Sequence, residues 1–122
     1  MILADTTVWI DHLRYMDPDL EMLLQGGSIV MHPFVAAEVA LGSLRDRRKT
    51  LAELDSLDAI QVASTSEVRF LIESNSLFSK GIGLTDVHLI ASCLISPGIE
   101  LWTRDIRLKK VAQALGIHAN LP

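Results

Sequence analysis

Short apolar runs rich in β-branched residues alternate along this chain with longer stretches whose apolar residues recur at helical spacing. This alternation is typical of βα units, in which a helix returns the chain so that the next strand can pair in parallel with the previous one. At 122 residues, the chain suits a single domain over residues 1–122. The pattern therefore predicts one α/β domain with a mainly parallel central sheet flanked by helices.

The same runs give positions for the elements. Strands are expected over residues 2–4, 28–31, 59–63 and 99–103. Seven helices are expected between and after the strands. The first four are a helix capped by Thr6 or Thr7, one from Pro18 to the Gly26-Gly27 pair, one over residues 33–42 and a polar one over residues 45–57. The last three run from a Ser64–Glu67 capping box to residue 78, from a cap at Thr85 to a point before Pro97, and over residues 107–115.

Composition excludes several classes of protein. The single cysteine, Cys93, can form neither an internal disulfide nor a cysteine-based zinc cluster, so a reducing, cytoplasmic setting is expected. Asp5 comes too early for a signal peptide, and no uncharged apolar run approaches the roughly 20 residues of a membrane span. With 15 acidic residues against 11 basic ones, a general cationic coat for nucleic acid is not expected either.

Two carboxylates follow apolar strands. Asp5 stands directly after the first predicted strand, and Asp105 stands just past the last one. Taken alone, each is explained by N-capping of the helix that follows it. The functional interpretation is that ligands of open α/β sheets bind outside the carboxyl ends of the strands, where both acids would lie. The hydroxyl of Thr103 is expected close to Asp105.

Two further carboxylates share helix faces with apolar residues. Glu38 falls on the stripe formed by Phe34, Ala37 and Leu41, and a buried unpaired carboxylate there would cost several kcal/mol. Asp86 begins the apolar face of its predicted helix, where it would also gain from the helix dipole. An edge position or a partner arginine for Glu38, and a simple first-turn role for Asp86, are the structural alternatives.

The conjunction of these four acids is more informative than any one of them. Right-handed parallel connections can bring the ends of strands and helices to one edge of the sheet. Four carboxylates in one cleft would repel each other and raise their pKa values unless a divalent cation were present. Because all the donors are oxygens, Mg²⁺ or Mn²⁺ would suit the cleft, and such a site can hold a phosphodiester and activate a water.

Four ordered motifs resemble those of the PIN-domain ribonucleases, and within them the VapC-type toxins of bacterial toxin–antitoxin pairs. The motifs are Asp5-Thr6-Thr7-Val8-Trp9-Ile10, Glu38-Val39-Ala40-Leu41-Gly42, Gly83-Leu84-Thr85-Asp86-Val87-His88-Leu89-Ile90-Ala91 and Thr103-Arg104-Asp105. The sequence departs from the family pattern at His32-Pro33, where a small hydroxyl residue is commoner, and around Asp105, where an Asn or a second acid is often seen.

The resemblance implies a PIN-like three-layer sandwich and a Mg²⁺- or Mn²⁺-dependent endoribonuclease toxin. It assigns the catalytic and metal-binding roles to Asp5, Glu38, Asp86 and Asp105, with Thr6 and Thr103 in support. It also implies a homodimer and a small VapB-type antitoxin that blocks the cleft. Arg104 and Arg107 lie close enough to Asp105 in the sequence to suggest contacts with RNA phosphates.

The acidic balance of the chain agrees with this implication. Its excess of four acids equals the size of the proposed metal site, so one or two divalent ions would cancel half or all of it. We therefore expect RNA binding to depend on metal. The basic stretch over residues 45–49 is either a solvated helix face or a contact surface for RNA or for a partner protein. The four histidines show no paired metal-ligand spacing and are interpreted as structural or surface residues.

Two alternatives to a ribonuclease remain open at this stage. Asp5 could accept a phosphoryl group, as in aspartyl-phosphate enzymes, although relatives of the haloacid dehalogenases usually carry a second Asp where this chain has Thr7. Alternatively, the acids could serve only a protein partner with basic side chains, in a non-catalytic PIN-like binding module.

Overall fold

The centre of the molecule is a four-stranded, entirely parallel sheet. The computed structural model describes all residues, Met1–Pro122. The strands are β1 (Ile2–Ala4), β2 (Ile29–Met31), β3 (Asp58–Ala59) and β4 (Glu100–Trp102), in the order β3-β2-β1-β4. In the central strand β1, Leu3 pairs with Val30 of β2 on one side and with Leu101 of β4 on the other. The predicted α/β class with a parallel sheet is confirmed.

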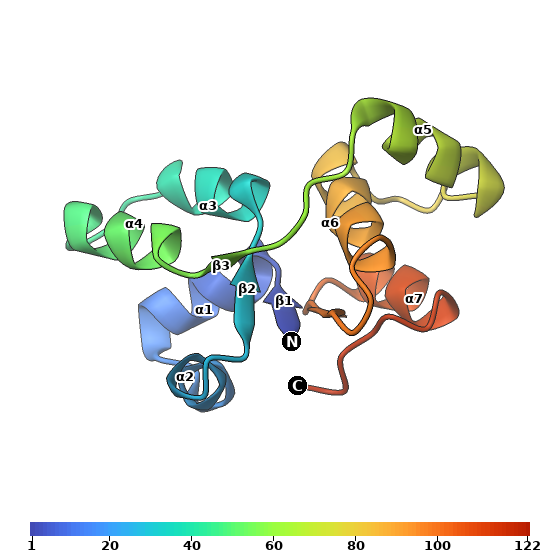
Figure 1. Cartoon of the computed structure of the whole chain (residues 1–122). Helices are drawn as coiled ribbons and strands as arrows, with labels where there is room; N and C mark the ends of the chain where they lie inside the picture. The colour runs from blue at the N-terminus through green and yellow to red at the C-terminus, as the bar shows by residue number, and fades with distance from the viewer.

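Seven helices cover the sheet. They are α1 (Thr6–Tyr15), α2 (Pro18–Gln25), α3 (Pro33–Ala40), α4 (Arg47–Asp55), α5 (Thr65–Ser74), α6 (Leu84–Leu94) and α7 (Ile106–Ala114). Figure 1 shows α1 to α4 on one side of the strands and α5 to α7 on the other. None of the helices has the length and apolarity needed to cross a bilayer.

Local signals account for several helix starts. The carboxylate of Asp17 accepts hydrogen bonds from the amides of Asp19 and Leu20 at 3.0 Å each, with Pro18 in the first helical position of α2. The predicted capping box of α5 is also present. In it, the Glu67 amide donates to the Ser64 hydroxyl and the Ser64 amide donates to the Glu67 carboxylate.

The structure corrects three predicted boundaries. The third strand is only Asp58–Ala59 because the chain leaves the sheet after the Ile60 amide bonds to Met31. Helix α5 ends at Ser74, four residues early, since Ser76 takes a positive φ of 51° that no helix continues. The residue that caps α6 is Gly83, and Thr85 already lies inside that helix.

One cluster of apolar side chains joins the sheet to both helix layers. The strands contribute Leu3, Leu101 and Trp102, all fully buried, and the helices contribute residues such as Ile90 and Leu108. In β1, Leu3 and Ala4 are fully buried, so the first polar side chain after this strand is that of Asp5, past its carboxyl end.

Candidate active site

The carboxyl ends of the two neighbouring strands β1 and β4 bring Asp5 and Asp105 to the same edge of the sheet. Asp5 is the first residue after β1, and its amide donates to the carbonyl of Trp102, the last residue of β4, at 2.9 Å. Asp105 follows three residues later along the chain from Trp102. The two acids are a hundred residues apart in sequence and are brought together by the pairing of β1 with β4.

All four sequence-predicted acids line one small hollow at this edge. The hollow measures about 120 Å³ and is lined by Asp5, Thr6, Thr7, Glu38, Asp86, Leu89 and Asp105. The acids come from four different places, namely the end of β1, helix α3, the first turn of α6 and the end of β4. Sequence reasoning therefore named every carboxylate in the hollow.

Asp5 is the most buried of these acids, with 4% of its surface exposed. One carboxylate oxygen, Oδ1, accepts from the amides of Thr7 at 3.0 Å and Val8 at 3.3 Å, and from the Thr7 hydroxyl. The other, Oδ2, accepts from the Thr103 hydroxyl. Burial raises the pKa of Asp5 above its ordinary value, and these hydrogen bonds offset only part of that effect. Asp5 thus caps α1 and lines the hollow at once.

Glu38 reaches the hollow for a different reason from the one predicted. The expected buried stripe of Phe34, Ala37 and Leu41 is wrong, since Leu41 is 87% exposed and Glu38 itself is exposed. The buried face of α3 is formed instead by Val35 and Val39. Glu38 therefore lies on the open side of its helix and bears no desolvation cost.

A hydroxyl group holds Glu38 in place. Its Oε1 atom accepts a hydrogen bond from the hydroxyl of Thr6, the first residue of α1, at 2.7 Å. The contact joins α1 to α3 across the hollow. It leaves the second carboxylate oxygen of Glu38 without a protein partner, available to a ligand.

Asp86 is half-buried in the first turn of α6. Its Oδ2 atom accepts a hydrogen bond from the Gly83 amide at 3.3 Å, which closes the helix start. Its pKa is raised, first by burial and then by the negative charges of Asp105, Asp5 and Glu38. This repulsion is electrostatic evidence that the four carboxylates share one site.

Asp105 is exposed and caps α7. Its Oδ1 atom accepts from the Leu108 amide at 3.0 Å, and its own amide donates to the Thr103 hydroxyl oxygen at 3.1 Å. No protein donor reaches Oδ2. The hydroxyl of the fully buried Thr103 thus accepts from the backbone amide of Asp105 and donates to the carboxylate of Asp5. Thr103 therefore lies beside Asp105, as expected from the sequence.

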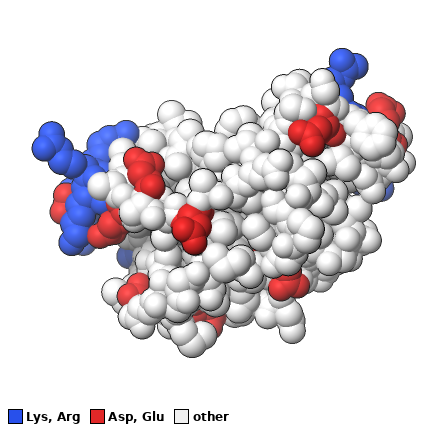
Figure 2. Space-filling model, in the orientation of Figure 1, with Lys and Arg blue, Asp and Glu red and all other residues white.

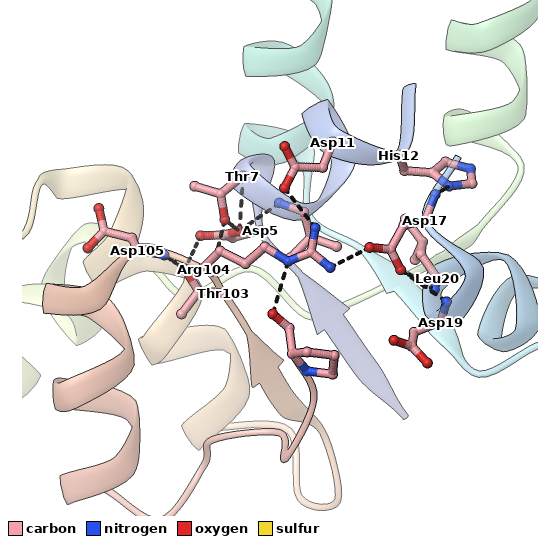
Figure 3. A network of polar contacts seen from close by, with 12 residues as sticks. Asp5, Thr7, Asp11, His12, Asp17, Asp19, Leu20, Thr103, Arg104 and Asp105 are labelled. Carbon is pink, nitrogen blue, oxygen red and sulfur yellow. Dashed lines mark hydrogen bonds and ion pairs between the residues drawn. The ribbon is translucent and has the colours of Figure 1, made fainter. Parts of the chain in front are cut away.

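Arg104 is engaged inside the molecule. Its guanidinium donates to Asp11 at 2.7 Å, to Asp17, and to the Pro122 carbonyl at 3.2 Å. Figure 3 shows this group pointing away from the carboxylate of Asp105. The expected phosphate contact is therefore not favoured for Arg104, whose donors are taken by these partners.

The contacts of the Arg104 guanidinium with Asp11, Asp17 and Pro122, here called the Arg104 clamp, had no signal in the sequence, because these partners lie near residue 104 only in the folded chain. Asp11 belongs to α1 and Asp17 caps α2. The backbone amide of Arg104 also donates to the Thr7 hydroxyl at 3.0 Å, and that hydroxyl donates to Asp5. The clamp thus fixes the segment that carries Thr103 and Asp105 against the start of α1.

Two buried histidines, His32 and His88, lie near each other, with ring centroids 6.4 Å apart. His32 is fully buried, and its Nδ1 atom accepts from the Phe34 amide at 3.0 Å, so it caps α3. Burial, together with the nearby His88, lowers the pKa of His32 to about 4. His32 is therefore neutral at physiological pH and has the structural role that the sequence analysis gave it.

The donor chemistry of the hollow fits a hard divalent cation. Every ligand that it offers is a carboxylate or hydroxyl oxygen, which Mg²⁺ and Mn²⁺ prefer. No three His, Cys, Asp or Glu side chains stand close enough to ligate one ion together as they are placed. Free carboxylate oxygens remain on Glu38 and Asp105, so an ion would draw these side chains inward or be reached through water.

The family model of the PIN domain matches residues 2–114, which includes all four acids of the hollow. The chain belongs to the PIN-domain family. Two relatives are each 40% identical to it over 117 residues, covering 96% of this chain and 94% of the relative. Both are described as "Ribonuclease VapC32", from the CDC 1551 / Oshkosh and ATCC 25618 / H37Rv strains of Mycobacterium tuberculosis. The resemblance to the VapC group of PIN domains is therefore confirmed over nearly the whole chain.

Proposed function

We propose that this PIN-domain protein is a VapC-type toxin that hydrolyses RNA phosphodiester bonds as a Mg²⁺- or Mn²⁺-dependent endoribonuclease. The observation that carries the proposal is the hollow in which Asp5, Glu38, Asp86 and Asp105 meet at the carboxyl edge of the sheet. The ribonuclease names of two full-length relatives supply the substrate class. The reaction adds water across one phosphorus–oxygen bond, and the leaving ribose oxygen takes a proton.

The four carboxylates would hold the cation, with different degrees of freedom. Asp5 is immobile because both of its oxygens already accept hydrogen bonds. Glu38 is steadied by Thr6, while Asp86 and Asp105 each keep one oxygen without a protein donor. When bound, the cation lowers the pKa of a water and stabilises the leaving oxygen. The free oxygens of Glu38, Asp86 and Asp105 can orient that water towards the phosphorus.

The geometry of Asp5 disfavours the phosphotransfer alternative. A carboxylate that attacks phosphorus needs an accessible oxygen with a lone pair free in the direction of attack. Asp5 is almost fully buried, and its oxygens accept four hydrogen bonds between them. Because Oδ2 accepts only one of these hydrogen bonds, it could still ligate a cation, and we assign Asp5 to ion binding.

A groove beside Glu38 supports the proposal of an antitoxin partner. It measures about 480 Å³ and lies between α1 and the α3–α4 connection. Its walls include the exposed apolar residues Ile10, Leu13 and Tyr15, and Glu38 stands at its border with the acidic hollow. A VapB-type segment seated here could reach the acids with a basic side chain and block them. Figure 2 shows lysines and arginines gathered over neighbouring α4, where they could contact the same partner or RNA.

Self-association and a cytoplasmic location complete the proposal. Large apolar side chains that are more exposed than buried, such as Phe70, Leu84 and Ile106, could form a homodimer contact. Light scattering behind a sizing column tests the dimer directly. A reducing cytoplasm would keep the buried Cys93 as a free thiol, which is its state in the structure.

Cleavage by matched aspartate variants tests the proposed function. Asp86→Asn should abolish Mn²⁺-dependent cleavage of RNA by the purified protein, while Asp55→Asn, an exposed change on α4, should leave the rate unchanged. Circular dichroism checks that both variants are folded. Metal-dependent cleavage by Asp86→Asn at the wild-type rate would overturn the proposal.

A further inference from the structure

A second hollow lies along α7, and its charge is opposite to that of the acidic one. It measures about 420 Å³ and is formed by one side of α7 and by the segment over residues 75–80. Its charged lining residues are Lys80, Arg107 and Lys110, and no carboxylate lines it. We call it the basic hollow. The chain as a whole has more acids than bases, yet every charged residue that lines this hollow is a cation.

The three cations of the basic hollow are free of internal partners. No carboxylate lies within 4.0 Å of any of them, whereas Arg104 pairs with two. An unpaired cation keeps its full charge for a ligand, and concave surroundings concentrate that charge. The arrangement therefore favours an anion.

The remaining lining of the basic hollow is largely apolar. Leu77, Val111 and Leu115 form its floor and walls between the cations. A nucleotide divides in the same way, into an anionic phosphate and a flat base with an apolar face. The guanidinium of Arg107 can also stack on a base, as arginines do in single-stranded RNA complexes.

The basic hollow and the acidic hollow share no lining residue, but short segments of chain connect them. Arg107 stands in the first turn of α7, two residues after Asp105, and Lys80 begins the loop that leads to the start of α6 at Gly83. The Arg107 side chain lies across Gly81 of this loop so closely that a Cβ atom there would come within 2.8 Å of its Cδ atom. Of the three cations, Arg107 is the one nearest in sequence to an acid of the other hollow.

We propose that the basic hollow binds a nucleotide of the RNA that flanks the cleaved bond, with its phosphate on Lys80, Arg107 and Lys110 and its base against the apolar wall. The proposal rests on the ribonuclease function proposed above and adds a second binding site to it. RNA is favoured over an acidic protein segment because Arg107 lies two residues after Asp105 and against the loop that leads to Asp86, so the hollow begins near the acids where the phosphodiester would be cut. The hollow is then a determinant of which RNA sequences are cleaved.

Binding to a fluorescent single-stranded RNA of about ten nucleotides tests the charges. The Asp86→Asn background keeps the RNA intact during the titration. Lys110→Ala and Lys80→Ala should each weaken binding about 3–10-fold near 0.1 M salt and reduce the slope of log affinity against log salt by about 0.7. Arg69→Ala removes the same charge from the exposed side of α5 and should change neither value. An equal loss in Arg69→Ala would reduce the effect to overall charge and overturn the proposal.

A steric variant and a crosslink test the base position. Ala114 lines the hollow on the exposed side of α7, so Ala114→Leu fills the hollow without changing charge or helix propensity much. We expect it to weaken RNA binding at least 3-fold with an unchanged salt slope. In the protein whose hollow is not mutated, RNA that carries 4-thiouridine should crosslink to residues 75–80 or 107–115. Crosslinks confined to other segments would contradict the proposal.

Cleavage by the acid-intact versions separates this proposal from the proposed function. Lys110→Ala and Ala114→Leu should raise KM and alter the preferred cleavage sites, with metal dependence unchanged. Metal-dependent cleavage with wild-type KM and sites in both variants would overturn the basic hollow and leave the ribonuclease function standing. RNA that crosslinks to the hollow but is never cleaved would overturn the ribonuclease function and leave RNA binding by the basic hollow standing. If these variants bound RNA as tightly as the wild type but bound poly-glutamate more weakly, the hollow would be assigned to an acidic protein segment.

Discussion

Thr103 donates its side-chain hydroxyl to the buried Oδ2 atom of Asp5, across 98 positions of sequence. The same hydroxyl oxygen accepts from the amide of Asp105. A fully buried threonine thus links the ends of β1 and β4 and sets the relative position of two of the four acids. The wall of the hollow is organised by hydroxyl groups as much as by carboxylates, since Thr6 does the same for Glu38.

Removing the Thr103 hydroxyl should therefore affect both stability and catalysis. Thr103→Val keeps the shape but leaves Oδ2 of Asp5 without a donor, which we expect to lower the free energy of unfolding by about 1–3 kcal/mol. Urea unfolding measures the loss, and RNA cleavage at saturating Mn²⁺ should slow at least 10-fold. Thr103→Ser, which retains the hydroxyl, should recover most of both. A fully active and stable Thr103→Val protein would contradict the linking role.

The Arg104 clamp predicts a coupled pair. Burial alone would raise the pKa of Asp17, but the hydrogen bonds and charge of Arg104, with the Leu20 amide, lower it. A lowered pKa stabilises the fold at pH values above the ordinary carboxyl pKa, and this contribution is lost as the pH falls from there through the lowered pKa. Arg104→Ala should thus cost about 1–3 kcal/mol at pH 7 and noticeably less at pH 3. Thermal unfolding of the variant at the two pH values, with exposed Arg14→Ala as the control, measures the difference.

Asp86 predicts a trade between stability and metal binding. Its raised pKa means that its ionised form destabilises the metal-free fold, and this cost appears as the pH rises above the ordinary carboxyl range. Asp86→Asn should therefore raise the melting temperature by about 2–4 °C at pH 7 without metal, and by less near pH 3.5. Adding Mn²⁺ should stabilise the wild type but not the variant, because only the native site binds the ion. Equal stabilisation of both proteins by Mn²⁺ would argue against the acids as its ligands.

His32 predicts the acid sensitivity of the fold. With a pKa of about 4, the buried imidazole stays neutral where an unfolded histidine, with a pKa near 6.5, is charged. Stability is then fully present above about pH 6.5 and is lost as the pH falls towards 4, by up to about 3 kcal/mol. In His32→Asn, the amide oxygen can still cap α3, so the variant should be less stable at pH 7 but lose less on acidification. An unchanged pH dependence would show that other groups cause the acid sensitivity.

Metal dependence of RNA affinity is a further expected outcome. Without an ion, the four carboxylates of the hollow repel the phosphate backbone, and bound Mg²⁺ removes that repulsion. The wild-type protein should bind RNA at least 5-fold more tightly in Mg²⁺ than in chelator at constant ionic strength. Fluorescence anisotropy measures both affinities. Working on ice, or with Ca²⁺ in place of Mg²⁺, limits cleavage of the RNA during the measurement. Equal affinities in Mg²⁺ and chelator would contradict the charge argument.

The sequence was sufficient for the architecture because that depends on local, periodic signals. The four acids were named from motifs that resemble those of a family, whereas the periodic argument for Glu38 was wrong. The helix start at Asp17-Pro18 and the Ser64–Glu67 capping box, both predicted from the sequence, are present in the structure. The orientation of α3 was not predictable in this way. Its eight residues are apolar almost all round, so periodicity could not distinguish the face with Val35 from the face with Leu41.

Contacts between distant segments were also beyond the reach of the sequence. The pairing of Arg104 with Asp11 and Asp17 depends on how α1 and α2 pack next to the end of β4, and no spacing along the chain encodes it. The basic hollow is a similar case, because Lys80 and Lys110 become neighbours only through the packing of the 75–80 segment on α7. Periodicity identifies faces of single elements, whereas such pairs need the tertiary arrangement.

Three of the four acids have a second duty that constrains how the family can lose activity. Asp5 and Asp105 cap α1 and α7, and Asp86 closes the first turn of α6, whereas Glu38 stabilises no helix end. A descendant released from catalytic selection would still be selected for cap-forming residues at positions 5, 86 and 105. Drift should show first at position 38. Across related genomes, an intact glutamate there should therefore distinguish working nucleases from degenerate copies better than the three aspartates do.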